Sequence, residues 1–343
     1  MRTARLALSI VSSVFALSLG CSTAVTPADV APTDAASALV TDAVTADANV
    51  TSDARAPLAH GTVLQEGSSW LVLAQREDDP SDGSFTEHPA SEFHQAISRP
   101  IAHAALGSFA TPRSVRVFRG SQWVCDAAVE APVVLSVAEK GYDEDGSPMA
   151  RELHEVWESG LRAIAAKLTV TRGDCASGEW AQDSSLAAPV FAAPTAVDPS
   201  TSELAWAAIR ASAQGQKLHE DHMQLCAAEG SCATRWDLRS DVERTIRVFT
   251  TREGRRVVFA AIRSTEGCGA FGAELTMIAN LVTEGGRAVI RDAVFSEEPT
   301  TDPDAFVEGA RLEWRSHSAR MFIDAARALV VERVDVPVFG CGC

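Results

Sequence analysis

The sequence ARLEWRS at residues 310–316 alternates strictly between two kinds of side chain. Its first, third and fifth residues are apolar, whereas the second, fourth and sixth, Arg311, Glu313 and Arg315, are charged. Successive side chains of a β-strand point to opposite faces, so this period of two predicts a strand with one buried face and one face in water.

Similar alternation surrounds this segment throughout the last hundred residues. Short connectors at 252–255 and 284–286 suit hairpins between such strands. Upstream, a helix that begins near Ser202 is expected, since Leu204, Trp206 and Ile209 recur at helical spacing. The second half is therefore predicted to be a helix followed by an antiparallel β-meander, with strands at 246–250, 256–264, 287–295, 310–316, 320–324 and 329–338.

The first half mixes strand and helix patterns. The strongest helix is predicted over 149–168, where apolar residues recur at helical spacing, and a weaker helical region is predicted over 90–106. The two halves together predict an α+β fold, in which helices pack on antiparallel sheets and disulfides add stability. Strands are expected in the first half at 61–64, 70–73, 115–118, 122–129 and 133–139.

The domain organisation follows from shifts in composition. A stretch rich in Pro, Ala and Ser at 182–202 is the expected crossing between a first α+β half at 60–190 and a second half at 200–343. Residues 21–59 contain no aromatic side chain and are dominated by Ala, Asp, Thr and Pro. Such a segment buries too little apolar surface to fold, so we expect a disordered tether there.

The first twenty residues have the pattern of a signal peptide. A short cationic start precedes an apolar stretch at 6–19, which is too short to span a bilayer. The sequence SLGC at residues 18–21 resembles the lipobox of bacterial lipoproteins, although Ser18 stands where Leu is usual. That resemblance implies lipidation of Cys21 and anchoring in the membrane, and Ser22 after the cysteine favours the outer membrane. The alternative is an ordinary secretory signal with an incidental cysteine.

The charge balance argues against polyanionic partners. The chain carries 30 Lys and Arg against 46 Asp and Glu, a net charge of -16, and only three of the basic residues are lysines. The arginines are dispersed among carboxylates along the sequence, so no basic patch is predicted. We therefore expect no nucleic-acid partner.

Seven cysteines remain once Cys21 is set aside, and an exported chain meets an oxidising compartment. The expected bridges are Cys125 with Cys175, Cys226 with Cys232, and Cys268 with one of the last two cysteines, which leaves one thiol over. The disulfide candidates are thus Cys125, Cys175, Cys226, Cys232, Cys268, Cys341 and Cys343.

Two sequences suggest metal binding. On a helix, His219, His222 and Cys226 would share one face, where zinc or copper is geometrically possible. Exposed histidines among carboxylates are the alternative, and Cys226 has a disulfide candidate nearby. The sequence GYDEDG at 141–146 matches some positions of a calcium loop, but an acidic turn is the preferred interpretation.

One further motif resembles a nucleotide site. The sequence GCGAFG at 267–272 is a literal G-x-G-x-x-G and resembles the dinucleotide-binding fingerprint, which requires a preceding strand and a following helix. Residues 263–266 separate it from the predicted strand, and the periodicity of 273–282 fits helix and strand equally well. We expect a loop between strands and no cofactor.

The functional expectation is correspondingly general. No nucleophile elbow and no P-loop occurs. The leading hypothesis is a lipid-anchored lipoprotein of the bacterial envelope that binds a protein, glycan or small ligand without catalysis. The alternative is an envelope hydrolase, either metal-dependent through His219 and His222 or built on a triad assembled from distant segments.

Overall fold

The computed structural model describes residues 56–79, 82–102, 106, 111–229, 235–264, 271–297, 302–317, 319–324, 326 and 328–333. The chain divides into two units, Met1–Asp53 and Ala54–Cys343, and every described residue lies in the second. None of the helices in these described ranges is both long and apolar enough to cross a membrane.

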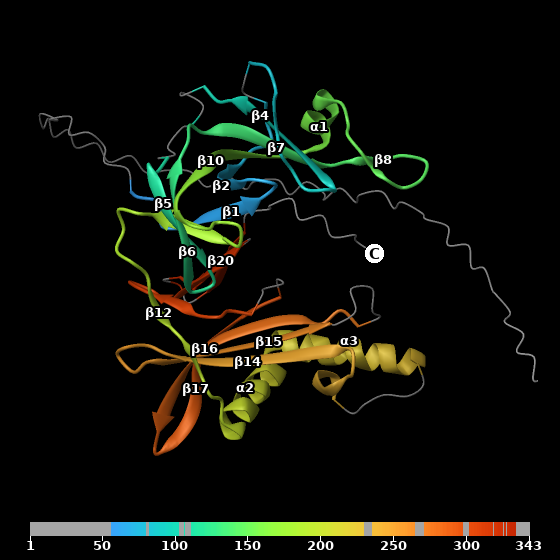
Figure 1. Cartoon of the computed structure of the whole chain (residues 1–343). Helices are drawn as coiled ribbons and strands as arrows, with labels where there is room; N and C mark the ends of the chain where they lie inside the picture. Colours follow the sequence, from blue (N-terminus) through green and yellow to red (C-terminus); the bar gives the residue numbers. More distant parts are fainter. Residues whose placement is uncertain are drawn as a thin grey trace, which may run out of the picture. The chain divides into compact units, whose positions relative to one another are not determined.

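The predicted fold class is wrong. Half of the structure is β-strand and 16% is helix, with three α-helices in the described part of the chain. The first half forms a closed antiparallel barrel of six strands, not a sheet covered by helices (Figure 1). The predicted helical regions at 149–168 and 90–106 both contain strands.

The barrel is closed because the last strand in its order also pairs with the first. The strand order is β2-β1-β11-β5-β6-β10, and β10 pairs with β2 to complete the ring. Its interior holds small and branched side chains that include Val63, Leu71, Val115 and Ala127. The bounds are β1 Gly61–Gln65, β2 Ser69–Gln75, β5 Ser114–Arg119, β6 Gln122–Val129, β10 Leu161–Gly173 and β11 Trp180–Asp183.

The predicted helix at 149–168 is helical only over seven residues and is strand from Leu161 onward. Helix α1 (Leu153–Ser159) ends at Gly160, where a side chain would collide with the Ser136 hydroxyl and the Val156 carbonyl. The chain then enters β10, whose residues Ile164–Ala166 are buried in succession because the strand is covered on both faces. A strand buried on both faces loses its alternation, so its apolar spacing resembles that of a helix.

The predicted helical region at 90–106 contains strand β4 (His94–Pro100). Ala96 packs with Trp70 and Leu135, whereas its neighbour Ile97 packs with Trp157 of α1. Both faces of this strand are therefore also buried, and its alternation is lost for the same reason. The barrel sheet continues from β10 through β7 (Val133–Glu139) and β4 to β3 (Thr86–His88), and a small hairpin pairs β8 (Gly141–Tyr142) with β9 (Pro148–Met149).

The second half begins with two helices and a five-stranded sheet. The Asp198 side chain accepts a hydrogen bond from the Thr201 backbone N–H at 2.9 Å and caps the first helix, in which Pro199 is the first residue. The segment left open at 273–282 is a strand, which pairs with both neighbours. The elements are β13 Pro194–Thr195, α2 Pro199–Ala211, α3 Ala213–Glu229, the 3-10 helix η2 Trp236–Leu238, β14 Val242–Thr250, β15 Arg256–Ser264, β16 Glu274–Glu284 and β17 Arg287–Ser296.

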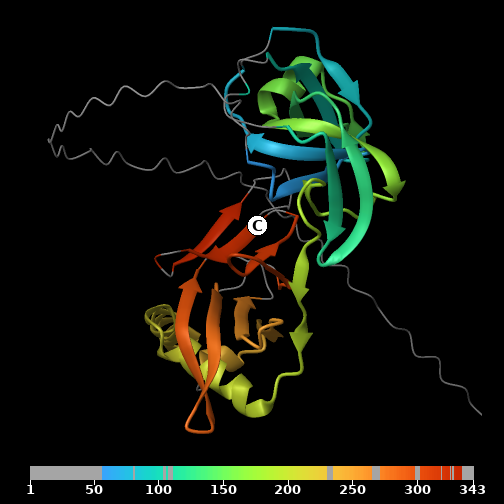
Figure 2. The same cartoon turned by 90° about the vertical axis from the view of Figure 1, so that its left-hand side faces the viewer.

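A second five-stranded sheet covers the other face of β14–β16. Val258, Ala260 and Ile262 share a core with α2, whereas the alternate residues of β15, such as Val257 and Phe259, share a core with this second sheet. In Figure 2 its strands from residue 306 onward are red. Its order is β12 (Val190–Ala192), β18 (Phe306–Glu308), β19 (Glu313–Arg315), β20 (Ala319–Ile323) and β21 (Leu329–Arg333).

Candidate functional site

The charged face of β19 is buried, contrary to the expectation that it faces water. Glu313 is 5% exposed and Arg315 is 8% exposed. Barrel strand β11 supplies the contacts: Arg315 Nη1 donates to Gln182 Oε1 at 3.1 Å, and its guanidinium carbon lies 4.9 Å from the Trp180 ring centroid. The alternation of 310–316 thus identified a strand, but both faces of that strand lie inside the protein.

Three arginines converge on the Glu313 carboxylate. Arg315 donates from Nε to Oε1 at 2.7 Å and from Nη2 to the same oxygen, and Arg320 donates from Nε and Nη2 to Oε2 at 2.9 and 2.6 Å. Arg311 Nε lies 3.5 Å from Oε2. Burial alone would raise the pKa of Glu313, but the charge of Arg315 and the hydrogen bonds from Arg315 and Arg320 outweigh it and lower that pKa. One carboxylate is therefore shared by three cations.

Arg311 differs from the other two arginines. Its guanidinium carbon lies 3.2 Å from the centroid of the Phe322 ring, and its side chain is 37% exposed. The ion pair with Glu313 and the stacking on Phe322 fix its position. Among the described residues, no acceptor takes a hydrogen bond from it. Within the described part of the chain, the Arg311 guanidinium is thus held in place without donating a hydrogen bond.

Three adjoining hollows meet at this arginine. Their volumes are about 300, 440 and 150 Å³, and Ala310 and Arg311 line all of them. The 150 Å³ hollow is mainly apolar, whereas charged side chains line the other two. The charged residues around the three hollows are five arginines and three glutamates, namely Arg252, Arg255, Arg311, Arg315, Arg320, Glu253, Glu308 and Glu313.

This gathering of arginines was missed in the sequence, where the arginines are dispersed. The signal lies in the register of β19 and β20, which places Arg315 opposite Arg320 and Glu313 opposite Phe322. Alternation of charge along one strand does not reveal which charges lie across from it. In a chain of net charge -16, the local excess of arginine over glutamate marks this region as chemically distinct.

His60 lies beside the same cluster. Its Nε2 is 3.4 Å from the Ser316 carbonyl oxygen, and its ring centroid is 6.2 Å from that of Trp180. Burial lowers the pKa of His60 to about 3, and the positive charge of Arg315 acts in the same direction. The imidazole is therefore neutral near pH 7 and adds no charge to the cluster.

The predicted metal ligands lie elsewhere, on α3. The ring of His222 is fully buried, lies 3.5 Å from Cys226 Sγ through Nε2 and packs edge-on against Phe271. Cys226 is disulfide-bonded, so its sulfur is not a thiolate ligand, and His219 is half-buried. Within the described ranges, no three His, Cys, Asp or Glu side chains gather as a metal site.

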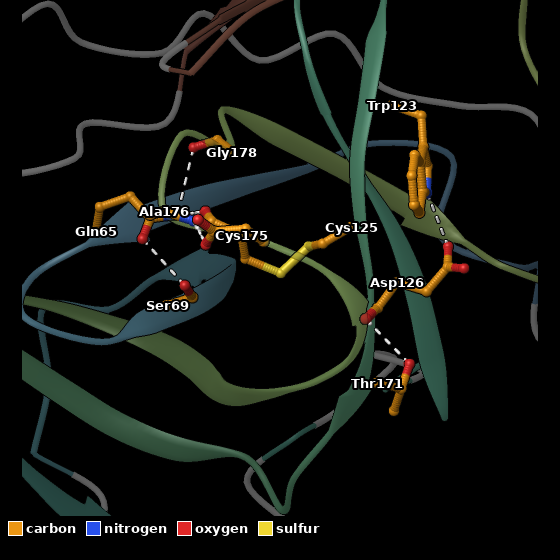
Figure 3. Close-up of a disulfide and its surroundings, with 10 residues drawn as sticks. Gln65, Ser69, Trp123, Cys125, Asp126, Thr171, Cys175, Ala176 and Gly178 are labelled. Carbon is orange, nitrogen blue, oxygen red and sulfur yellow. Dashed lines mark hydrogen bonds between the residues drawn. A yellow bond between two sulfur atoms is a disulfide. The ribbon is translucent and has the colours of Figure 1, made fainter.

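One disulfide joins two parts of the barrel (Figure 3). Cys125 of β6 bonds to Cys175, with 5.2 Å between their Cα atoms, and both side chains are buried. The Cys175 carbonyl accepts a hydrogen bond from Gln65 Nε2 at 2.7 Å. This is the bridge expected for the first half. Five other cysteines with predicted roles lie outside the described residues: Cys21, Cys232, Cys268, Cys341 and Cys343.

A serine and a histidine are in contact at the start of β4, but not as a catalytic pair. Ser91 Oγ lies 2.8 Å from His94 Nδ1, and Glu66 Oε2 lies 3.7 Å from the same nitrogen. A hydrolytic triad needs the nucleophile and the carboxylate on opposite nitrogens of the imidazole. The Ser91 hydroxyl also accepts the His94 backbone N–H at 3.1 Å, which is a local turn contact.

Two other motifs serve local structure or fall partly outside the described residues. Asp143 Oδ1 accepts backbone N–H groups of Asp145 and Ser147, so this carboxylate closes its own turn. Residues 267–270 of the glycine motif are not described, and the segment that follows is strand β16 instead of the helix that a dinucleotide site requires.

No family model, no curated protein and no solved structure matches the chain.

Proposed function

We propose that this protein is a lipid-anchored lipoprotein of the bacterial envelope whose folded body binds an anionic ligand without catalysis. Arg311 carries the binding part of this proposal, because its guanidinium is fixed by Glu313 and Phe322 while its donors have no acceptor among the described residues. A guanidinium offers planar, paired N–H groups that match carboxylate and phosphate oxygens. A group fixed in advance also loses less conformational entropy when a ligand binds.

The remaining arginines of the cluster support Arg311. Arg315 and Arg320 donate hydrogen bonds to Glu313, and Arg320 Nη1 also lies 3.3 Å from Glu332 Oε2. This network explains how charged side chains are tolerated inside the protein, since buried charges require partners. Arg311 belongs to this network through Glu313, and its partly exposed side chain lines all three hollows.

The hydrolase alternative receives no support from the described side chains. His222 is enclosed by Cys226 and Phe271, and the disulfide of Cys226 withholds the third ligand of the suggested metal site. The contact between Ser91 and His94 has the geometry of a turn. We therefore propose binding as the function and do not assign a reaction.

Thermal unfolding of the full chain in detergent tests the binding claim. The probes are inorganic phosphate and linear carboxylates from acetate to hexanoate, at constant ionic strength. At ten times its Kd, a bound anion raises the Tm by about 3 °C. We expect Arg311→Gln to abolish the rise and Arg172→Gln to preserve it, because Arg172 also stacks on a ring, that of Trp123, but in the barrel. Equal rises in wild type and Arg311→Gln, or none with any probe, would overturn the binding claim.

The anchor is tested separately. We expect radiolabelled palmitate to be incorporated into the wild-type chain and not into Cys21→Ser, since lipidation of that cysteine would supply the attachment to the membrane. Equal labelling of the two chains would contradict the lipoprotein assignment and leave the binding claim intact.

A further inference from the structure

We propose that the ligand is a small amphiphilic monocarboxylate, with its carboxylate on Arg311 and its apolar group in the 150 Å³ hollow. This inference rests on the proposed anion-binding function and adds the chemical class of the ligand.

The apolar hollow has the size of a single ring. An apolar cavity of about 150 Å³ is large enough to bind benzene in other proteins. The volume here is about 150 Å³, which suits a phenyl group or a short branched chain and is too small for a long acyl chain. Seven apolar side chains line it: Val257, Ile278, Phe306, Ala310, Leu312, Phe322 and Ile323.

Arg311 connects the two chemical environments. Its guanidinium stacks on Phe322, a wall of the apolar hollow, and Arg311 also lines both charged hollows. A carboxylate on the N–H edge of Arg311 therefore has its substituent beside the apolar hollow. The other arginine of this hollow, Arg255, already donates from Nε and Nη2 to Asn280 Oδ1 at 3.1 and 3.0 Å.

The charge balance favours a single negative charge. Arg315 and Arg320 are engaged with Glu313, and Arg320 also with Glu332, so two carboxylates compensate these two guanidinium charges. Arg252 and Arg255 balance Glu253 and Glu308 in the adjoining charged hollow, so Arg311 is the one positive charge of that hollow without a matching carboxylate in its lining. A monocarboxylate matches that single charge, whereas a phosphate dianion exceeds it.

Isothermal titration calorimetry of the full chain tests this assignment with three probes: 3-phenylpropionate, propionate and 3-phenylpropanol. Burial of the phenyl group should make 3-phenylpropionate bind about 30-fold more tightly than propionate. The neutral alcohol should bind at least tenfold more weakly than 3-phenylpropionate, because it cannot form a charge-assisted pair with Arg311.

Two variants distinguish the contribution of the carboxylate to binding from that of the phenyl group. Ala310→Leu, at an exposed residue that lines all three hollows, should fill part of the apolar one and remove most of the phenyl advantage while propionate binding persists. Arg311→Gln should weaken both carboxylates, whereas Arg172→Gln should weaken neither. Unchanged thermal unfolding of Ala310→Leu without ligand shows that it folds.

The outcomes distinguish the two proposals. If both carboxylates bind with equal affinity and depend on Arg311, the apolar subsite is wrong but anion binding stands. If the alcohol binds as tightly as 3-phenylpropionate, the carboxylate assignment is wrong. If the two carboxylates fail to bind while another anion binds through Arg311, this inference alone fails. If no anion binds, or binding is unchanged in Arg311→Gln, the proposed function fails as well.

Discussion

Acid should destabilise the folded body through His60. The pKa of this half-buried imidazole is lowered to about 3 by burial and by Arg315, whereas an unfolded chain restores a value of about 6.5. Between these values the unfolded state binds the proton and the folded state does not, so stability falls as the pH falls. From pH 7.5 to pH 5.0 the loss assigned to His60 is about 2 kcal/mol, since each pH unit below 6.5 costs about 1.4 kcal/mol.

The assay is urea unfolding of wild type and His60→Gln at pH 7.5 and pH 5.0. Other titrating groups are common to both chains, so they cancel when the two pH-dependent losses are subtracted. Wild type should lose about 2 kcal/mol more than the variant, because glutamine takes up no proton in either state. Equal losses in the two chains would refute the burial of a neutral imidazole beside Arg315.

Two further predictions concern stability near neutral pH. Glu313→Gln should lower the free energy of unfolding by about 3 kcal/mol, because Arg315 loses its buried counter-ion; in urea unfolding, a midpoint as little changed as that of the exposed control Glu284→Gln would speak against this. Replacing both Cys125 and Cys175 by Ala should cost about 2–4 kcal/mol, because the bridge closes a loop over a sequence separation of 50, and a loss below about 1 kcal/mol in the same assay would disagree.

The strands of the second half were largely readable from the sequence, and parts of the first half were not. The predicted strands at 256–264 and 287–295 appear as β15 and β17. Both segments are rich in β-branched residues and are bounded by turn residues, which is the pattern of a strand. The predicted helix at 149–168 contains α1 but failed from Leu161 onward, because β10 is buried on both faces at Ile164–Ala166 and loses its alternation there. Whether a strand is covered on one face or two depends on distant elements, and local periodicity does not contain that information.

The sequence predicted the charged residues of the candidate site but not their burial or their convergence. The alternation at 310–316 predicted one charged strand face, with Arg311, Glu313 and Arg315 in water. Strand β19 covers only Glu313–Arg315, and Arg311 before it stays partly exposed. Glu313 and Arg315 are buried, and Gln182 and Trp180 of the barrel, more than a hundred residues away in the sequence, contact Arg315. A long-range contact of this kind has no local signature, so the convergence of arginines emerges only from the fold.

A crystal structure of the full chain with 3-phenylpropionate would show whether Arg311 and the apolar hollow bind a monocarboxylate. We expect the carboxylate within hydrogen-bond distance of the Arg311 guanidinium and the phenyl ring between Phe306 and Phe322 in the apolar hollow. A structure in which the ligand occupies another site, while Arg311 and the three hollows remain empty at saturating ligand, would contradict it.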